Sequence, residues 1–568
     1  MSERRALWLV VLSALAARLV LLVARGDYIV YDEGYYLLLA RSLRAGHGFT
    51  LNGLPHVALS PLQPVLVALV SATGMPDVWA SRLLAAICGS LLVLPVAALG
   101  RRMGADKLAL VAAVLTAASP ALMSFVPFFP GESWNLYFGS EPLFLLLAFG
   151  AVASAARACE TGWRWWAATG LLAGAAYLAR AEGAVLGAAL FVVLAAVLAA
   201  RRARASDWKR YALAAVAALV VTAPYLGYLR ATLGRWALSG RVQAAAAAAN
   251  VELPSAVQGA RAGGRVLEGF VWQGEPDAFL RALYGLDPSG ERMASQYWGV
   301  HRDAAPASGG AAIPAIRTDS GAPPQAAAVR RSAFGIWRRG LAAVVPWWLA
   351  LLGLCGLAAV GRAGLIWIAP LAVCALLPSL LTYVEPRSLL PLAPLAAIYA
   401  GAAVLWVAGR IPAGWRARAR PALVAATALA LVEPAARDLV RAWPQSTALQ
   451  QVATARRVVG EYLGAHLPPD SLVMSWHPAV ALWASRDWRV LPYASFESTV
   501  DYARRQRVSA IVFSRFEPSP VRQPPRAFTI VLPGVGAASG VSPQLQPLDE
   551  TPLLFVGRLA GDSTGRTP

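Results

Sequence analysis

The sequence predicts a polytopic α-helical membrane protein of about eleven spans, followed by an α/β domain at the C-terminus. Hydrophobic residues make up 57% of the 568 residues and charged residues only 14%, whereas soluble proteins contain about 25% charged residues. The apolar excess is concentrated in residues 1–435. These observations exclude an ordinary soluble enzyme.

Eleven apolar runs are candidates for membrane spans, because a helix of about 20 residues crosses about 30 Å of hydrocarbon. They lie at 6–24, 79–99, 108–126, 140–158, 165–179, 183–200, 211–229, 341–360, 364–382, 388–408 and 421–435. The first run follows Arg4 and Arg5 like a signal peptide, but it is long for one, so we interpret it as a retained helix. The shorter run 61–70 is expected to lie as a helix in the membrane interface.

Positive charge predicts the orientation of these spans. The chain carries 51 Lys and Arg against 31 Asp and Glu, a net charge of +20. With the N-terminus in the cytoplasm, most of this excess falls in cytoplasmic loops, and the short outer loops contain only Arg180 and Arg387. An odd number of spans then places the C-terminal region outside. The excess is therefore a topology signal and gives no reason to expect a nucleic-acid partner.

Three regions outside the spans share the outer face: a first loop at 25–78, a long loop at 230–340 and a domain at 436–568. In the last, strands are expected at 471–476, 489–493 and 509–514, with helices at 480–484 and 499–507, and the final twenty or so residues are expected to be poorly ordered. All four cysteines lie in or at the end of apolar segments, so no disulfide framework is expected.

Acidic residues at the outer ends of the spans are the candidate site residues, because ionisable groups at a membrane are costly. Six face outward in this topology: Asp32, Glu33, Glu132, Glu141, Glu182 and Glu385. Arg180 and Arg387 each lie two residues from one of them. Such a set suits group transfer, in which a carboxylate takes a proton from an acceptor and arginines hold a phosphate leaving group. Since the chain has no glycine-rich nucleotide motif, a donor used outside the cell is expected to be lipid-linked.

Structural interpretations of the same residues stay open. The pairs Arg180–Glu182 and Arg387–Glu385 are equally well explained as loop salt bridges. Asp32 suits a helix cap and Glu141 a helix N-terminus, while Glu132 is interpreted as a loop residue. Arg18 and Arg82 are expected to extend to lipid phosphates. No metal is required: His47 and His56 lack metal-ligand spacing, although a divalent ion remains an alternative.

Six motifs in order along residues 1–435 resemble bacterial GT-C glycosyltransferases, nearest to the protein mannosyltransferase and aminoarabinose transferase type of glycosyltransferase family 39. They are YDEGYYLLLARSL, SPLQPVLVALV, ASRLLAAICGSLLVLPVAALGRR, GSEPLFLLLAFGA, GLLAGAAYLARAEGAVL and YVEPRSLLPLAPLAAIYAG. The resemblance implies a GT-C-like module at 1–435 in a bacterial inner membrane, with a periplasmic α/β domain at 436–568. It also implies inverting transfer from a polyprenyl-phosphate sugar to a periplasmic lipid A, surface glycan or protein.

The resemblance assigns roles to five residues. Asp32 matches the first-loop acid that activates the acceptor, Glu33 is its motif partner, and Glu141 matches a second acidic position. Arg387 matches a basic position suited to the donor phosphate, and Arg180 has a similar role. The chain departs from the family at Ser60–Pro64, where Pro-Pro-Leu-Tyr-Pro is common, and the loop 230–340 aligns with nothing, which leaves the acceptor open.

Two other functions remain as alternatives. A transporter or flippase of a lipid-linked substrate predicts an internal repeat with broken helices at the membrane midplane, but the Gly and Pro interruptions do not recur in matching halves. The second alternative is a scaffold protein whose C-terminal domain binds a partner.

Overall fold

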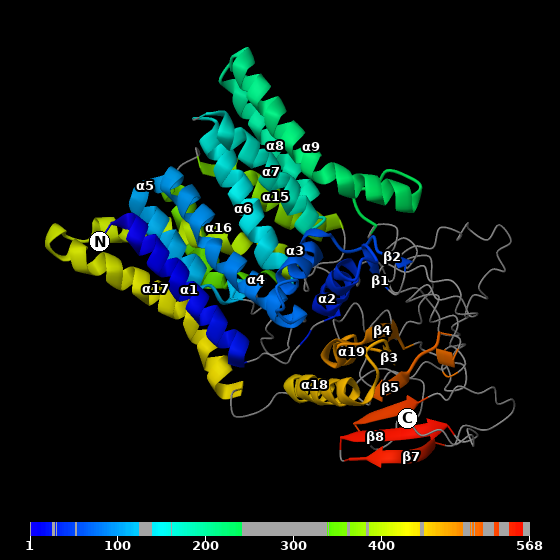
Figure 1. Ribbon diagram of the computed structural model, residues 1–568. Coiled ribbons are helices and arrows are strands. Elements are labelled where there is room, and N and C mark those ends of the chain that lie inside the picture. The colour runs from blue at the N-terminus through cyan, green and yellow to red at the C-terminus, as the bar shows by residue number, and fades with distance from the viewer. Residues whose placement is uncertain are drawn as a thin grey trace, which may run out of the picture. The chain divides into compact units, whose positions relative to one another are not determined.

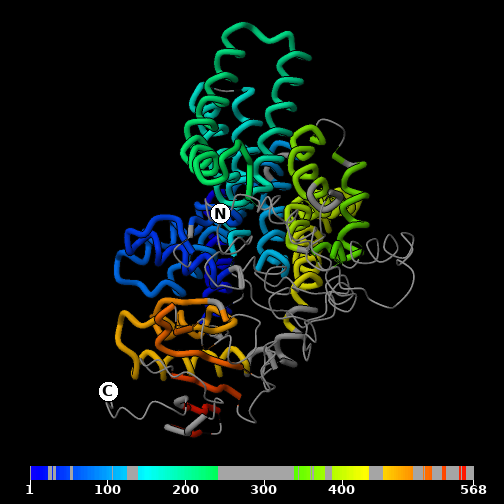
Figure 2. The backbone as a smooth tube through the Cα atoms, turned by 90° about the vertical axis from the view of Figure 1, so that its right-hand side faces the viewer, coloured from blue at the N-terminus to red at the C-terminus, as the bar shows by residue number. Residues whose placement is uncertain are grey.

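In the computed structural model the chain forms two compact units, each made of segments that are separate in sequence (Figures 1 and 2). Unit 1 comprises Met1–Gly26, Ser60–Leu238 and Pro323–Gln445, and unit 2 comprises Asp27–Leu59, Ser239–Ala322 and Ser446–Pro568. The structure describes residues 2–24, 29, 31–51, 54–123, 139–160, 162–240, 338, 340–342, 344–360, 364–381, 386–442, 448–491, 500, 503–504, 506–514, 527–532, 545–551 and 553–559.

Unit 1 is helical. Its elements are α1 (Glu3–Ala24), α3 (Leu62–Ser71), α4 (Asp77–Leu91), α5 (Val93–Ala118), η1 (Pro120–Leu122), α6 (Glu141–Ala158), α7 (Trp163–Ala179), α8 (Gly183–Ala200), α9 (Ala205–Leu233), α14 (Trp347–Val360), α15 (Leu365–Leu381), η3 (Pro386–Leu389), α16 (Leu392–Arg410) and α17 (Ala413–Ala442). Its core contains Phe149, Trp166, Leu190 and Ile398, whereas Leu219 and Val220 of α9 are about two-thirds exposed. Apolar side chains all round a helix are typical of membrane spans.

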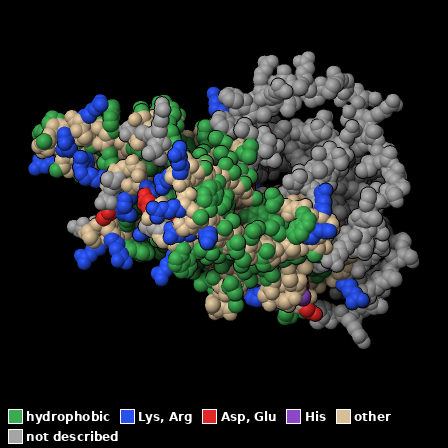
Figure 3. Space-filling model, turned by 90° about the horizontal axis from the view of Figure 1, so that it is seen from above, with side chains coloured by type: hydrophobic (Ala, Val, Ile, Leu, Met, Phe, Trp, Pro, Cys, Tyr) green, Lys and Arg blue, Asp and Glu red, His purple; other side chains and the backbone are tan. Residues whose placement is uncertain are grey.

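The chain is a multi-pass membrane protein. Within the described ranges, six helices are long and apolar enough to cross a membrane: Glu3–Val23, Asp77–Gly104, Glu141–Ala158, Gly183–Ala200, Ala205–Leu233 and Leu392–Arg410. Four shorter apolar helices accompany them, including Lys107–Ala118 and Leu365–Leu377. The predicted count of eleven spans is therefore not established. On the face seen in Figure 3, Lys and Arg side chains surround apolar ones, and Asp and Glu are few.

The helix α5 contains the reversal expected between the second and third predicted spans. A Cβ added to Gly100 would lie 3.2 Å from the carbonyl oxygen of Leu108. Eight residues of straight helix rise about 12 Å, so this contact requires the chain to turn back. Val93 and Ala97 accordingly pack in one cluster with Ala109 and Ala113.

Two glycines four residues apart join α7 to α9. A Cβ on Gly170 would overlap the carbonyl oxygen of Ala214, and one on Gly174 would lie 2.9 Å from that of Ala218. Small residues with this spacing let membrane helices approach closely, so that backbone and side chains pack without a hydrophobic driving force.

Gly170→Val is expected to lower the free energy of unfolding by about 1–3 kcal/mol, because the added side chain overpacks the α7–α9 contact. The measurement is thermal unfolding in detergent. The matched control is Gly187→Val, since nothing lies within 4 Å of a Cβ at Gly187 on α8. Equal destabilisation by the two substitutions would contradict the proposed contact and leave only a helix-propensity effect.

Arg18 and Arg82 do not extend to the surface, so that prediction is wrong. Arg18 is 3% exposed and donates to the carbonyl oxygens of Ala14 at 3.1 Å and Leu122 at 2.6 Å. Its guanidinium lies against Gly89, where a Cβ would be 2.9 Å from Nε. Arg82 is fully buried. Burying a guanidinium is costly unless it donates hydrogen bonds, and Arg18 donates one of its bonds to Leu122 in η1, far along the chain.

Unit 2 contains a six-stranded mixed sheet. Its elements are α2 (Tyr31–Arg44), β1 (Thr50–Leu51), β2 (Leu54–Pro55), α18 (Ala448–His466), β3 (Leu472–Ser475), α19 (Ala479–Ala484), β4 (Asp487–Val490), β5 (Ala510–Ser514), β6 (Phe528–Leu532), β7 (Leu545–Glu550) and β8 (Leu554–Leu559). The strand order is β4-β3-β5-β6-β8-β7. Strand β3 pairs in parallel with both β4 and β5, Met474 facing Arg489 and Ile511, whereas β5 and β6 are antiparallel.

The predicted α/β arrangement is present, but strands β6, β7 and β8 were not predicted, and the predicted helix 499–507 lies largely outside the described residues. Strand β8 lies between β6 and β7 in the sheet, so Leu554–Leu559 are not poorly ordered as expected. The core includes His477, whose Nδ1 accepts a hydrogen bond from the Ala479 amide at 3.1 Å. Burial, with a smaller effect of Arg456, holds the pKa of His477 well below its usual value, which keeps the imidazole neutral as an acceptor.

Candidate active site

A tight turn between α7 and α8 places Arg180 and Glu182 in the interior of unit 1. Helix α7 ends at Ala179, its C-cap Arg180 has an extended backbone, and Glu182 is the N-cap of α8. The turn requires glycine next, because a Cβ on Gly183 would overlap the backbone of Ala176. Arg180 Nη2 then lies 2.9 Å from Glu182 Oε1, so the local ion pair expected from the sequence is formed.

The start of α6 supplies the central carboxylate. Glu141 is the first residue of the helix, with Ser140 as N-cap and Pro142 in the first turn, an arrangement typical of helix N-termini. Its Oε1 lies 2.5 Å from Arg180 Nη1, and the same nitrogen is 3.5 Å from Ser140 Oγ. Both side chains of the Arg180–Glu141 pair are only 5% exposed. A buried ion pair is stable only when its geometry is good enough to offset the loss of hydration, and removing one member leaves an uncompensated charge.

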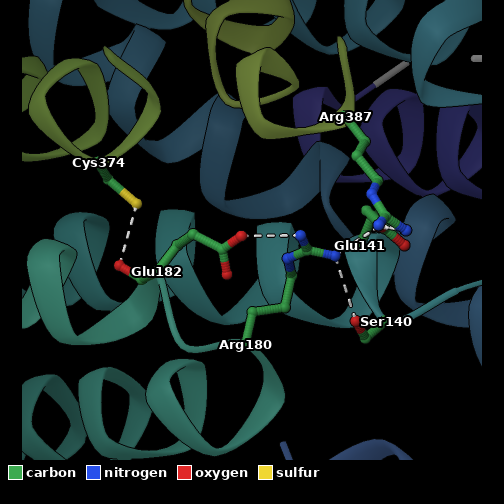
Figure 4. Close-up of polar contacts among 6 residues, drawn as sticks. All are labelled: Ser140, Glu141, Arg180, Glu182, Cys374 and Arg387. Carbon is green, nitrogen blue, oxygen red and sulfur yellow. Dashed lines mark hydrogen bonds and ion pairs between the residues drawn. The ribbon is translucent and has the colours of Figure 1, made fainter. Parts of the chain in front are cut away.

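Arg387 reaches the same carboxylate from η3, just before α16. Its Nη1 lies 3.8 Å from Glu141 Oε1, and its side chain is 10% exposed. Figure 4 shows Arg180 and Arg387 approaching Glu141 from different elements. Two guanidinium groups therefore share one carboxylate oxygen. Among the described residues, no hydrogen-bond partner is found for the other oxygen, Oε2.

A small cavity opens at this cluster. Its volume is about 250 Å³, counting the part that is open to solvent. The polar residues that line it are Glu141, Arg180, Glu182, Cys374, Arg387 and Ser388. The thiol of Cys374 on α15 donates to the carbonyl oxygen of Glu182 at 3.4 Å. Arginine clusters of this type bind phosphate groups through paired charge-assisted hydrogen bonds. Arg180 and Arg387 can thus bind a phosphate, which would replace part of their contact with the Glu141 carboxylate.

The structure brings together three of the five predicted site residues: Glu141, Arg180 and Arg387. Asp32 and Glu33 lie in the first turn of α2, which belongs to unit 2, and Glu33 is buried. The side chain of Asp32 lies outside the described part of the chain, as do Glu132, Glu385 and residues 241–337 of the long loop.

Sequence reasoning missed two members of the cluster. Ser140 was recognisable, because a serine before Glu-Pro at the start of an apolar run is typical of a helix N-cap. Cys374 carries no such signal, since it lies in the middle of an apolar helix and reaches Glu182 only through the packing of α15 on α8.

The described residues contain no group of three or more His, Cys, Asp or Glu that could hold a metal ion. His56 is buried, and its Nε2 accepts a hydrogen bond from the Leu59 amide at 3.0 Å. His47 is exposed.

A segment of the chain that includes Glu141 and Arg180 matches a known protein family. Residues 58–228 match the family model described as dolichyl-phosphate-mannose-protein mannosyltransferase. The family resemblance predicted from the sequence is confirmed. So is the predicted class of enzyme, a glycosyltransferase whose donor is a sugar linked to a lipid phosphate.

Solved structures similar to this chain include ArnT from Cupriavidus metallidurans in the apo state, with 14% identity and a TM-score of 0.49 over 89% of this chain and 92% of that one. ArnT bound to undecaprenyl phosphate gives 15% identity and a TM-score of 0.48 over 89% and 93%. The Archaeoglobus fulgidus oligosaccharyltransferase tethered with an acceptor peptide has 15% identity and a TM-score of 0.49, over 90% of this chain and 69% of that one. The sequence has no match among curated proteins.

Proposed function

We propose that the chain transfers a sugar from a polyprenyl-phosphate donor to a periplasmic acceptor, which is lipid A, a surface glycan or a protein, with inversion at the anomeric carbon. The enzyme sits in a bacterial inner membrane with its N-terminus in the cytoplasm and its C-terminal domain in the periplasm. The observation that carries this proposal is the meeting of the buried Arg180 and Arg387 side chains at one carboxylate oxygen of Glu141, beside a small cavity.

The reaction assigns a role to each predicted site residue. The acceptor oxygen or nitrogen attacks the anomeric carbon, and its proton passes to the Asp32 carboxylate. The bond between the anomeric carbon and the phosphate oxygen breaks, and its electron pair stays on the polyprenyl phosphate. Arg387 and Arg180 stabilise the charge that develops there. Glu141 holds the two guanidinium groups in place before the donor binds, and Glu33 supports Asp32 as its motif partner.

Glu141 also explains why two arginines can be kept close together without a bound anion. Two guanidinium groups that both contact one carboxylate repel each other strongly in a buried environment. The Glu141 carboxylate lies within 4 Å of both guanidinium groups and reduces that repulsion. When a phosphate enters, it supplies the same compensation, and the arginines need no large rearrangement to receive it.

Arg387→Gln tests the donor site. We expect the donor KM to rise about 10- to 100-fold, because a hydrogen bond between charged groups contributes about 1.5–3 kcal/mol. The acceptor KM should change little. Arg387→Lys keeps the charge but not the paired donors, so it should recover part of the loss. Kinetics with a polyprenyl-phosphate sugar as variable substrate provide the measurement.

The matched control is Arg164→Gln, since Arg164 is exposed and lies at the other end of α7 from Arg180. It should leave the donor KM unchanged. An unchanged donor KM in Arg387→Gln, with full turnover, would contradict a phosphate-binding role for Arg387.

A further inference from the structure

We infer that the α/β domain at the C-terminus positions the acidic helix α2, and that Gly34, Tyr35 and Arg41 transmit this effect to Asp32. The inference rests on the proposed function for the role of Asp32, but the contacts themselves belong to unit 2. Helix α2 and the sheet lie in one compact unit although hundreds of residues separate them in sequence. Helix α2 contacts α19 directly (Figures 1 and 2).

The closest contact is at Gly34, two residues after Asp32. A Cβ at Gly34 would lie 2.6 Å from Pro478 Cγ and 3.7 Å from Leu482 Cδ1. Gly34 is helical and has no positive φ, so the glycine is explained by close approach and not by backbone conformation. Pro478 is the N-cap of α19 and a rigid neighbour.

The next residue makes an aromatic contact. The rings of Tyr35 and Trp488 have centroids 5.9 Å apart at 47°, within the range that stabilises aromatic pairs. Trp488 lies on β4, and its Nε1 donates to the carbonyl oxygen of Ser475 at 3.0 Å. Both aromatic side chains are buried. Tyr35 is thus held by a residue that is itself fixed to the sheet.

The C-terminal half of α2 is tied by Arg41. Its guanidinium donates to the carbonyl oxygens of Arg486 at 3.2 Å and Leu482 at 3.4 Å. Arg486 in turn donates to the carbonyl oxygen of Gly464, at 2.7 Å, near the end of α18. The contacts therefore cover α2 from its first turn to its last, which fixes both its axis and its rotation.

The length of α2 makes these contacts necessary. It has 14 residues, and isolated helices shorter than about 12–15 residues are marginal in water. Asp32 lies in its first turn, so the backbone position of Asp32 depends on the helix being held. A displacement of about 1 Å at a reacting group can cost about 100-fold in rate.

The test combines Gly34→Ala with the compensating Pro478→Ala in the full-length protein in detergent. Alanine favours helix more than glycine, so a clash with Pro478 is the only reason to expect weaker order in α2. We expect Gly34→Ala to speed amide hydrogen exchange over residues 31–44 and to lower kcat about 10- to 100-fold with little change in donor KM. The double variant should restore both. Gly187→Ala is the matched control, because a Cβ there meets nothing within 4 Å.

Arg41→Gln is a second, milder variant that removes the charge-assisted bonds without a clash, and it should shift exchange and kcat in the same direction. Unchanged exchange in both variants, loss of kcat that Pro478→Ala does not reverse, or faster exchange with wild-type kcat would each overturn the inference. A wild-type chain that transfers no sugar would instead refute the proposed function, while the exchange measurement would still decide whether the domain holds α2.

Discussion

Asp32→Asn is expected to lower kcat by about 100- to 10,000-fold, because the amide cannot take the proton of the acceptor in the transfer step. Donor binding should be preserved, since the arginines that receive the phosphate lie on other elements. The measurement is steady-state transfer with a separate donor-binding assay. This is the largest effect on turnover that the proposed function predicts for a single substitution.

Asp207→Asn is a suitable control for this substitution. Asp207 pairs locally with Arg210, at 3.3 Å and in part exposed, in the first turn of α9. Its loss should leave turnover within about twofold of wild type, since exposed pairs contribute less than about 1 kcal/mol. Full turnover in Asp32→Asn would remove Asp32 from the mechanism.

Arg180→Gln is expected to have the second largest effect. It leaves the Glu141 and Glu182 carboxylates without their shared guanidinium in a buried site, which costs about 3–5 kcal/mol of stability for a broken buried pair. Turnover should also fall, by less than in Asp32→Asn. Thermal unfolding in detergent and transfer kinetics provide the two measurements.

The double variant Arg180→Gln with Glu141→Gln separates the two interpretations of this pair. Removing both charges should recover part of the stability, because no unpaired charge is left at Glu141, although Glu182 still lacks the guanidinium of Arg180. If Arg180 binds the donor phosphate, turnover should stay low. Recovery of both stability and turnover would mean that the Arg180–Glu141 ion pair is structural only.

The location of the site could be predicted because its residues lie next to the ends of apolar runs. Glu141, Arg180 and Arg387 each border a hydrophobic segment, so the predicted topology places them at one face. The sequence could not predict their pairing. It left the local pair Arg180–Glu182 as one alternative, whereas the contact of Arg180 with Glu141 joins α7 to α6 and depends on tertiary packing.

Long-range packing also explains the other differences. Arg18 donates to the nearby Ala14 carbonyl, and its second acceptor, the Leu122 carbonyl, lies far along the chain. Strands β6, β7 and β8 escaped prediction. For β7 the reason is Pro547 at the sheet edge, where proline is tolerated although it breaks the usual strand pattern. The place of α2 in unit 2 depends on contacts such as Gly34 with Pro478.

The most direct test of the central claim is donor turnover by the purified full-length protein. Polyprenyl-phosphate sugars with a radiolabelled sugar are supplied together with lipid A, surface glycan and protein acceptors. The proposed function predicts one free polyprenyl phosphate released for each new glycosidic bond, with both products lost in Arg387→Gln at low donor concentration. Failure to consume any such donor, together with movement of the intact lipid across vesicles, would contradict the claim and favour a transporter.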